Sequence, residues 1–227
     1  IIGAMKAEVE QLKQEMNQPE VVTVAGMEFY RGTIGEKEVV VVQSGIGKVS
    51  AALCVQILAD RFGVDGVVNT GIAGSLKAEI NIGDIVLSTD TMQHDVDARE
   101  FGYPLGQIPR METLAFEADE NLRKLAKEVC EEVNPDIQVF EGRVASGDQF
   151  VADKETKERI IENTQAYCTE MEGAAIGQAA YLNKIPYLVI RAISDKADDS
   201  AHVDYPTFER QAIRHTVNLV SRMMECL

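Results

Sequence analysis

Tryptophan is absent from this chain of 227 residues, histidine occurs only three times, and basic residues are scarce. Against 37 aspartates and glutamates stand 22 lysines and arginines, which gives a formal net charge of −15. A surface this acidic repels phosphate backbones and anionic headgroups, so nucleic acid and membrane surfaces are poor partners. No apolar run approaches the roughly 20 residues of a membrane span. The longest candidates, such as residues 39–42, have the length of a strand.

Cysteine is also rare, and Cys54, Cys130, Cys168 and Cys226 form neither a CxxC pair nor a short metal-ligand spacing. We therefore expect reduced thiols, packed as small apolar groups, in a cytoplasmic protein. The chain does not open with a basic region followed by an apolar stretch, so no signal peptide is expected. It begins inside an apolar strand at Ile1, and we expect a few leading residues to be missing.

The composition, 45% hydrophobic and 26% charged, is that of an ordinary globular protein. Strand-like runs alternate with helical patterns along the whole chain, without a linker. Strands are expected at residues 1–4, 21–33, 38–43, 66–69, 84–88, 138–145 and 187–192. Helices are expected at residues 7–16, 49–62, 117–133, 154–162, 171–182 and 207–225. This alternation, with a hairpin turn at Gly35, predicts one α/β domain over residues 1–227, a three-layer α/β/α sandwich with a central mixed sheet.

Glycine-rich or polar segments follow five of the predicted strands, where ligands bind in such sheets. They are residues 3–8, 44–48, 69–74, 146–150 and 194–198. Gly45-Ile46-Gly47-Lys48 lacks the GxxxxGK[ST] spacing of a phosphate loop, so a tight strand-to-helix turn is the better interpretation. The segment 69–74 is not GxGxxG, and a dinucleotide cofactor is unsupported.

Two further kinds of site find little support. His94, Asp95 and Asp97 cluster hard donors, but no second histidine lies at a suitable spacing, so no metal site is expected. The sequence has no GxSxG motif of the kind that holds the nucleophile of a Ser-His-Asp triad, so such a triad is not expected.

Carboxylates at the strand ends are more promising. Glu8 opens the first helix, Asp195 follows a strongly apolar run, and Glu170 and Glu172 flank Met171 at a helix start. Each alone is explained by helix capping or by the helix dipole. Their joint appearance at separate strand ends favours a site.

These segments together resemble one family. The motifs are Gly3-Ala4-Met5-x-x-Glu8, Ser44-Gly45-Ile46-Gly47-Lys48, Asn69-Thr70-Gly71-x-Ala73-Gly74, Ser146-Gly147-Asp148-x-Phe150, Glu170-Met171-Glu172 and Arg191-Ala192-Ile193-Ser194-Asp195-x-Ala197-Asp198. In this order, over essentially the whole chain, they resemble the bacterial 5′-methylthioadenosine/S-adenosylhomocysteine nucleosidases of the purine nucleoside phosphorylase superfamily. The resemblance implies an adenine nucleoside as substrate, no metal or cofactor, a homodimer, and a place in methionine salvage.

The resemblance also implies roles for single residues. Glu8 would activate the attacking water, Asp195 would donate a proton to adenine N7, and Glu172, beside Met171, would accept from the ribose hydroxyls. Phe150 would stack on adenine, and the backbone of Val151 would bond to its Watson–Crick edge. The remaining substrate-binding residues implied are Ile46 near the alkylthio group, Ala73, Gly74, Ser194, Ala197, Tyr205, and the loop residues Phe101, Tyr103 and Pro109. A neighbouring subunit would supply that loop, although it could equally cap its own domain.

The chain departs from the family at Lys6 and Ala7, where acidic residues are frequent, and at Ile72, where serine is frequent. Neither departure removes a catalytic group.

The residues favour hydrolysis over phosphorolysis, because a carboxylate at Glu8 repels phosphate and the segment 69–75 has no arginine. Arg191 is more suited to orienting a carboxylate. Two alternatives stay open: a nucleosidase for a related substrate, such as aminodeoxyfutalosine, and a non-catalytic nucleoside-binding module.

Overall fold

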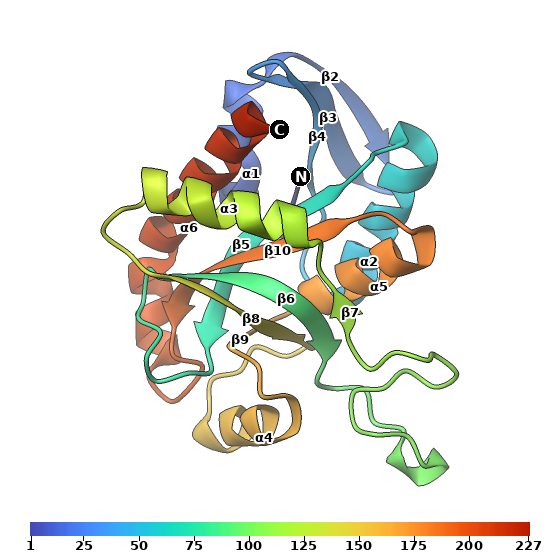
Figure 1. Cartoon of the computed structure of the whole chain (residues 1–227), viewed down its shortest axis with the longest axis vertical. Coiled ribbons are helices and arrows are strands. Elements are labelled where there is room, and N and C mark those ends of the chain that lie inside the picture. Colours follow the sequence, from blue (N-terminus) through green and yellow to red (C-terminus); the bar gives the residue numbers. More distant parts are fainter.

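The computed structural model describes residues 1–227 and has ten strands in one mixed sheet (Figure 1). The strands are β1 (Ile2–Gly3), β2 (Asn17–Val24), β3 (Met27–Ile34), β4 (Lys37–Gln43), β5 (Val67–Ser75), β6 (Ile85–Gln93), β7 (Phe116–Glu117), β8 (Val139–Ser146), β9 (Cys168–Glu170) and β10 (Tyr187–Asp195). The helices are α1 (Lys6–Glu15), α2 (Lys48–Ile57) with a π-helical continuation (Leu58–Phe62), a 3₁₀ turn (Arg99–Phe101), α3 (Glu120–Val133), α4 (Lys154–Thr164), α5 (Gly173–Asn183) and α6 (Ala201–Cys226).

The sheet closes on itself in part. Its order is β10-β6-β8-β9-β5-β1-β4-β3-β2, and β10 also pairs with β5, so five strands form a ring. Within it, β5 and β10 run parallel to each other, and β10 runs antiparallel to β6. The short strand β9 lies between β5 and β8, and brings its end at Glu170 beside Ser146.

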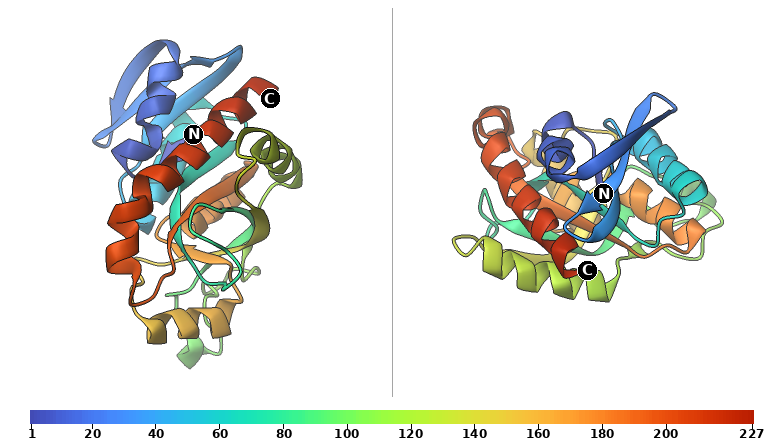
Figure 2. Two further views of the ribbon diagram at one scale, coloured as in Figure 1. Left: turned by 90° about the vertical axis from the view of Figure 1, so that its left-hand side faces the viewer. Right: turned by 90° about the horizontal axis from the view of Figure 1, so that it is seen from above.

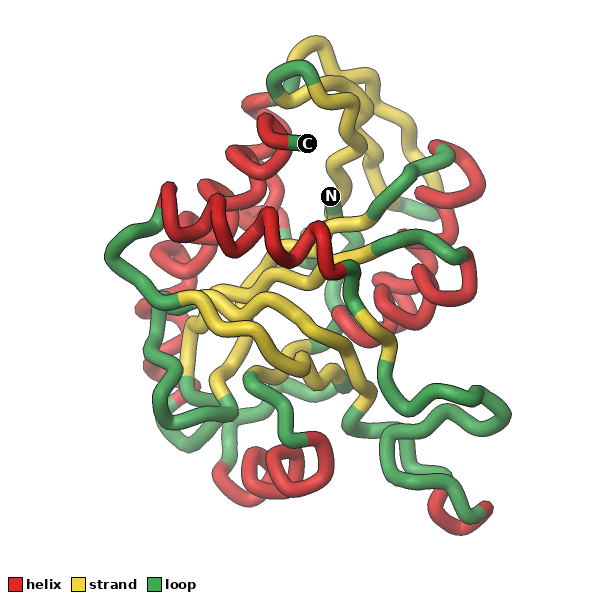
Figure 3. The backbone as a smooth tube through the Cα atoms, viewed as in Figure 1, coloured by secondary structure: helices red, strands yellow, loops and turns green.

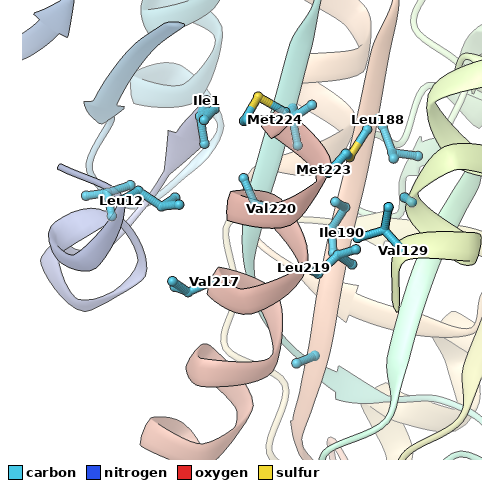
Figure 4. Packing of buried hydrophobic residues seen from close by; sticks show 14 of the residues in the cluster. Ile1, Leu12, Val129, Leu188, Ile190, Val217, Leu219, Val220, Met223 and Met224 are labelled. Atoms are coloured by element: carbon cyan, nitrogen blue, oxygen red, sulfur yellow. The ribbon is translucent and has the colours of Figure 1, made fainter. Parts of the chain in front are cut away.

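Helices cover both faces of the sheet, and each face has its own apolar core. One core packs α1, α3 and α6 against the sheet, and the other packs α2 and α5 against the opposite face. Figure 2 shows α6 and α3 on one side of the molecule and α2 and α5 on the other. In the first core, Val217, Leu219 and Val220 of α6 lie near Leu12 of α1 and Ile190 of β10 (Figure 4). The predicted three-layer sandwich is confirmed.

Several predicted bounds were wrong. The run 21–33 is two strands, β2 and β3, joined by a turn at Ala25 and Gly26, which both have positive φ. The strands β7 and β9 were missed. Helix α6 begins at Ala201 and contains Pro206, whereas the prediction began after that proline.

The segment between β6 and β7 protrudes from the body of the molecule and carries the short 3₁₀ turn (Figures 1 and 3). None of the helices combines the length and apolarity that spanning a bilayer requires.

Candidate active site

Glu8 lies at the third position of α1, directly after the central strand β1. Its side chain is buried, and its carboxylate accepts hydrogen bonds from the backbone N–H of Met5 (2.9 Å) and of Ile72 (3.3 Å). The bond from Met5 caps the helix, so the capping interpretation also holds. A Cβ at Gly71 would lie 2.6 Å from Glu8 Oε1 and 2.7 Å from Arg191 Nη1, and this close approach explains the glycine. Burial raises the pKa of Glu8, against the opposing charge of Arg191 and the backbone N–H donors.

Arg191, on β10, is the buried cation of the site and is 1% exposed. Its Nη2 donates to Asn69 Oδ1 (2.6 Å), and both Nε (3.1 Å) and Nη2 donate to Glu170 Oε2. Glu170 in turn accepts from the Gly173 N–H (2.8 Å) at the start of α5 and from the Ser146 hydroxyl. The guanidinium therefore holds the carboxyl end of β9 against the middle of the sheet, as the orienting role predicted from the sequence requires.

Glu172 occupies the N-cap position of α5, yet its carboxylate does not cap that helix. Instead Oε1 accepts from the backbone N–H of Gly47 (2.9 Å), and Oε2 lies 3.7 Å from Arg191 Nη2. Burial and the charge of Glu170 raise the pKa of Glu172 to about 7, in spite of Arg191 and Gly47. The pKa is raised because the carboxyl is buried beside Glu170, and because the one guanidinium that opposes the shift is shared with Glu170.

Asp195 ends β10 and is 2% exposed. Its Oδ1 accepts from the Ala197 N–H (2.8 Å), and its Oδ2 accepts from the Ser194 hydroxyl (2.8 Å). A Cβ at Gly74 would lie 2.7 Å from Ala197 Cβ and 2.8 Å from Asp195 Oδ1, so this turn requires a glycine opposite it. Burial, with smaller contributions from Asp204 and other acidic neighbours, raises the pKa of Asp195. The side chain does not cap a helix, because α6 begins only at Ala201.

Tyr205 of α6 lies close enough to both catalytic candidates to feel their charge. Its hydroxyl donates to the Sδ atom of Met5 (3.4 Å), the N-cap residue of α1, and burial together with Glu209, Glu8 and Asp195 raises its pKa to about 12. The Phe150 ring meets it edge-on, with centroids 5.7 Å apart. These two aromatic rings are therefore in contact within one chain.

The other predicted residues divide into two groups. Val151 is buried, Met171 is half-buried beside Glu172, Ile46 is exposed beside Gly47, and the Ala73 carbonyl lies 3.4 Å from Ser194 Oγ. By contrast, the loop residues Phe101, Tyr103 and Pro109 make no recorded contact with these groups; Phe101 is 83% exposed, and the Tyr103 hydroxyl accepts from the Arg110 N–H. The interpretation in which this loop caps its own domain is therefore wrong for Phe101.

Three positioning groups were missed by sequence reasoning: Asn69, Gly71 and Ser146. Each stands inside a motif that was noticed, but its partner lies far along the chain. A cavity of about 370 Å³ lies at the opposite end of the strands, where Val39 and Val68 line it, and it contains none of the carboxylates described above.

Comparison with known proteins agrees with this geometry. A family model described as the phosphorylase superfamily matches residues 1–225. The 5′-methylthioadenosine/S-adenosylhomocysteine nucleosidase of Bacillus thuringiensis (strain Al Hakam) is 40% identical over 226 residues, which cover 99% of this chain and 97% of the relative.

Solved structures are similar over the whole chain. The Neisseria meningitidis 5′-methylthioadenosine/S-adenosylhomocysteine nucleosidase, in complex with methylthio-immucillin-A, has a TM-score of 0.96 at 35% identity, covering 100% of this chain and 97% of its own. The futalosine hydrolase of Helicobacter pylori strain 26695 has a TM-score of 0.94 at 36% identity, covering 100% and 96%.

Fold and site together define an α/β enzyme with a buried, carboxylate-rich centre at the strand ends. The chain belongs to the phosphorylase superfamily. Within it, the relatives described above, which match this chain over nearly their full length, are nucleosidases and a hydrolase.

Proposed function

We propose that residues 1–227 act as one catalytic domain that hydrolyses the N-glycosidic bond of 5′-methylthioadenosine and S-adenosylhomocysteine, and also that of 5′-deoxyadenosine. Adenine and a 5-alkylthioribose are the products. The observation that carries this proposal is the set of three buried carboxyl groups, Glu8, Glu172 and Asp195, which come from three separate helices or strands around one site.

The chemistry needs these groups because cleavage builds positive charge on the sugar and negative charge on the departing purine. Asp195, whose pKa is raised by burial, is suited to carry a proton and give it to adenine N7. Glu8, held by two backbone N–H groups, accepts a proton from the attacking water. Glu172 accepts hydrogen bonds from the ribose hydroxyls, and the Gly47 N–H holds its carboxylate in place by donating to Oε1.

The hydrogen bonds that Arg191 already makes support hydrolysis rather than phosphorolysis. A phosphorylase needs free cationic donors to hold phosphate. Here Nε and Nη2 of Arg191 already donate to Glu170 and Asn69, and Nη1 lies 3.4 Å from the Ile190 carbonyl oxygen. The buried carboxylate of Glu8 beside this arginine repels an anion and leaves water as the nucleophile.

A second candidate substrate is aminodeoxyfutalosine, because the Helicobacter pylori futalosine hydrolase is as similar in fold as the nucleosidases. The same carboxylates would serve either substrate. Ile46 would contact the 5′ substituent, but the sequence does not show which substituent is preferred. A comparison of kcat/KM for 5′-methylthioadenosine, S-adenosylhomocysteine, 5′-deoxyadenosine and aminodeoxyfutalosine therefore distinguishes the two candidate functions.

We also propose a homodimer. Val49 (80% exposed) and Leu53 (43% exposed) lie one turn apart on α2, and the neighbouring helix α5 exposes Tyr181. A partner on this face would cover an apolar surface and could receive the protruding loop with Phe101. Replacing Val49 and Leu53 with aspartate should convert the protein to monomers in size-exclusion chromatography with light scattering; a variant that stays dimeric would place the interface elsewhere.

The cell-level proposals are a cytoplasmic location and a role in methionine salvage and the recycling of S-adenosylmethionine by-products. The location agrees with four free thiols, three of them buried. The role in methionine salvage follows from the substrates alone, so the comparison of adenine nucleosides described above tests it. Release of adenine from neither methylthioadenosine nor adenosylhomocysteine would overturn it.

A further inference from the structure

Lys48, Asp95 and Asp148 form a closed ring of hydrogen bonds beside the site. Lys48 Nζ donates to Asp95 Oδ1 (2.6 Å), the Asp148 backbone N–H donates to Asp95 Oδ2 (3.0 Å), and the Lys48 backbone N–H donates to Asp148 Oδ1 (2.8 Å). Lys48 Nζ also donates to Gln93 Oε1 (3.0 Å). The ammonium group is therefore shared between two acceptors. Lys48 and Asp148 each take part through the backbone N–H and the side chain, and Asp95 takes part through both carboxylate oxygens.

The ring joins three segments that are far apart in the sequence. Lys48 begins α2, Asp95 follows the end of β6, and Asp148 follows the end of β8, in the loop that continues to Phe150. The residue before Lys48 is Gly47, which has φ of +96° and whose N–H donates to Glu172 Oε1 (2.9 Å). A Cβ at Gly47 would lie 3.0 Å from Asp148 Oδ1, so the ring closes tightly around this glycine.

We propose that Lys48 is a positioning residue: through Asp95 and Asp148 it holds the Gly47 N–H against Glu172 and keeps the loop of Phe150 in register with it. The inference rests on the proposed role of Glu172 toward the ribose. It also assigns a purpose to the His94-Asp95 segment, whose cluster of donors has no other function in the site.

Loss of the ring should act on Glu172 in a defined direction. The charged and titratable groups that face it are Glu170, Arg191 and Glu8, and Gly47 supplies a backbone donor. When that N–H moves away, the ionised form loses a charge-assisted hydrogen bond, and protonation becomes easier. We expect the acidic limb of the kcat/KM profile to move up by about one pH unit, with KM for a ribose nucleoside raised about tenfold.

The test is Lys48→Met, which keeps the aliphatic stem and removes the donor. The matched control is Arg123→Met, because the Arg123–Glu141 pair is as buried (18% and 31% exposed) as the Lys48–Asp95 pair (18% and 29%) and lies on α3 and β8, outside the site. Both variants lose a half-buried ion pair; Glu141 keeps its bond from Lys127 Nζ (2.9 Å), so the control should lose no more thermal stability than Lys48→Met. Only Lys48→Met should raise KM and shift the pH profile; a Lys48→Met enzyme with the KM and profile of Arg123→Met overturns the proposal.

A double variant tests the ring as a unit. Asp95→Asn should reproduce the KM increase of Lys48→Met, and the combined variant should lose no more than either alone, because one opened ring cannot be opened again. If the KM increases of the two single variants multiply in the double variant, the two residues act independently and the proposal of a single ring is contradicted.

A 2′-deoxy substrate separates this inference from the proposed role of Glu172. Glu172→Gln should raise KM for the ribose nucleoside more than for its 2′-deoxy analogue. If it does and Lys48→Met does not, the role of Lys48 is wrong while that of Glu172 stands. If Glu172→Gln affects both substrates equally, the ribose role itself fails.

Discussion

Replacing Asp195 with asparagine tests the proposed proton donor with little change of shape. Asn Oδ1 can keep the bond from the Ala197 N–H, and its amide can donate to Ser194 Oγ, whose hydrogen then points to the Ala73 carbonyl 3.4 Å away. The variant loses only the acidic proton. A well-placed general acid is worth about 10²–10⁴-fold, so kcat should fall by that factor, which corresponds to about 3–5 kcal/mol in the activation free energy.

Stability should not fall with activity. Burial raises the pKa of Asp195, so its carboxylate destabilises the fold at any pH above the pKa of the unfolded chain. Asparagine removes that cost, and the melting temperature at pH 7 should equal or exceed that of the parent enzyme. A lower kcat with an intact fold then reports on chemistry.

Two assays make the result specific. Adenine release is followed by absorbance, and a ribosyl substrate with an aryl leaving group that needs no protonation serves as the control. The variant should cleave the control substrate at nearly the parental rate, and the basic-side decline of kcat/KM should vanish for the nucleoside. Retention of nucleoside turnover within threefold of the parent enzyme would refute the assignment of Asp195.

Four further variants follow from the same geometry. Glu8→Gln should lower kcat by about 10²–10⁴-fold with an unchanged far-UV spectrum, and a rate near that of the parent would remove Glu8 from the mechanism. Arg191→Met should cost about 3–5 kcal/mol of unfolding free energy in urea, since it leaves buried carboxylates unpaired; a loss below 1 kcal/mol would contradict the ion network. Glu172→Gln should stabilise the protein at pH 8 more than at pH 5, because the unfolded carboxyl ionises near 4.5 and the folded one only near 7, so the cost grows across that window; equal melting shifts at both pH values would show that the pKa is not raised. Thr70→Val should add about 1 kcal/mol of stability, since the Thr70 hydroxyl is buried without a partner, and any destabilisation would mean that this hydroxyl is satisfied.

The layers of the fold were predictable because their signals are local. In the predicted helix 7–16, Val9 and Leu12 stand at the spacing of one helix face, and both are completely buried. The alternation of strands and helices along the chain predicted the mixed sheet with helices on both faces. The carboxylates of Glu8 and Asp195 were found because each follows a recognisable strand, and that of Glu172 because it stands at the start of a predicted helix.

Elements that depend on distant partners were not predictable. Strand β9 has three residues, too few for a period, and exists because β5 and β8 lie on either side of it. The turn at Ala25 and Gly26 needs positive φ at both residues, and alanine is an unusual choice there, so the run 21–33 resembled one strand.

The same limit applies to the centre of the site. Arg191 meets Glu170 across 21 residues and Asn69 across 122, and no spacing rule connects them. The ring of Lys48, Asp95 and Asp148 likewise joins three segments. In the sequence, Asp95 was considered only as a metal ligand and Lys48 only as part of a phosphate loop, and both interpretations were rejected, because each residue was judged by its immediate neighbours.

The most direct test of the central claim is the identity of the sugar released from 5′-methylthioadenosine, measured by mass spectrometry with and without phosphate. The account predicts free 5-methylthioribose and adenine in equal amounts, at a rate that does not depend on phosphate, since Glu8 activates water and Arg191 is committed to Glu170 and Asn69. A sugar 1-phosphate that forms only when phosphate is present would contradict it.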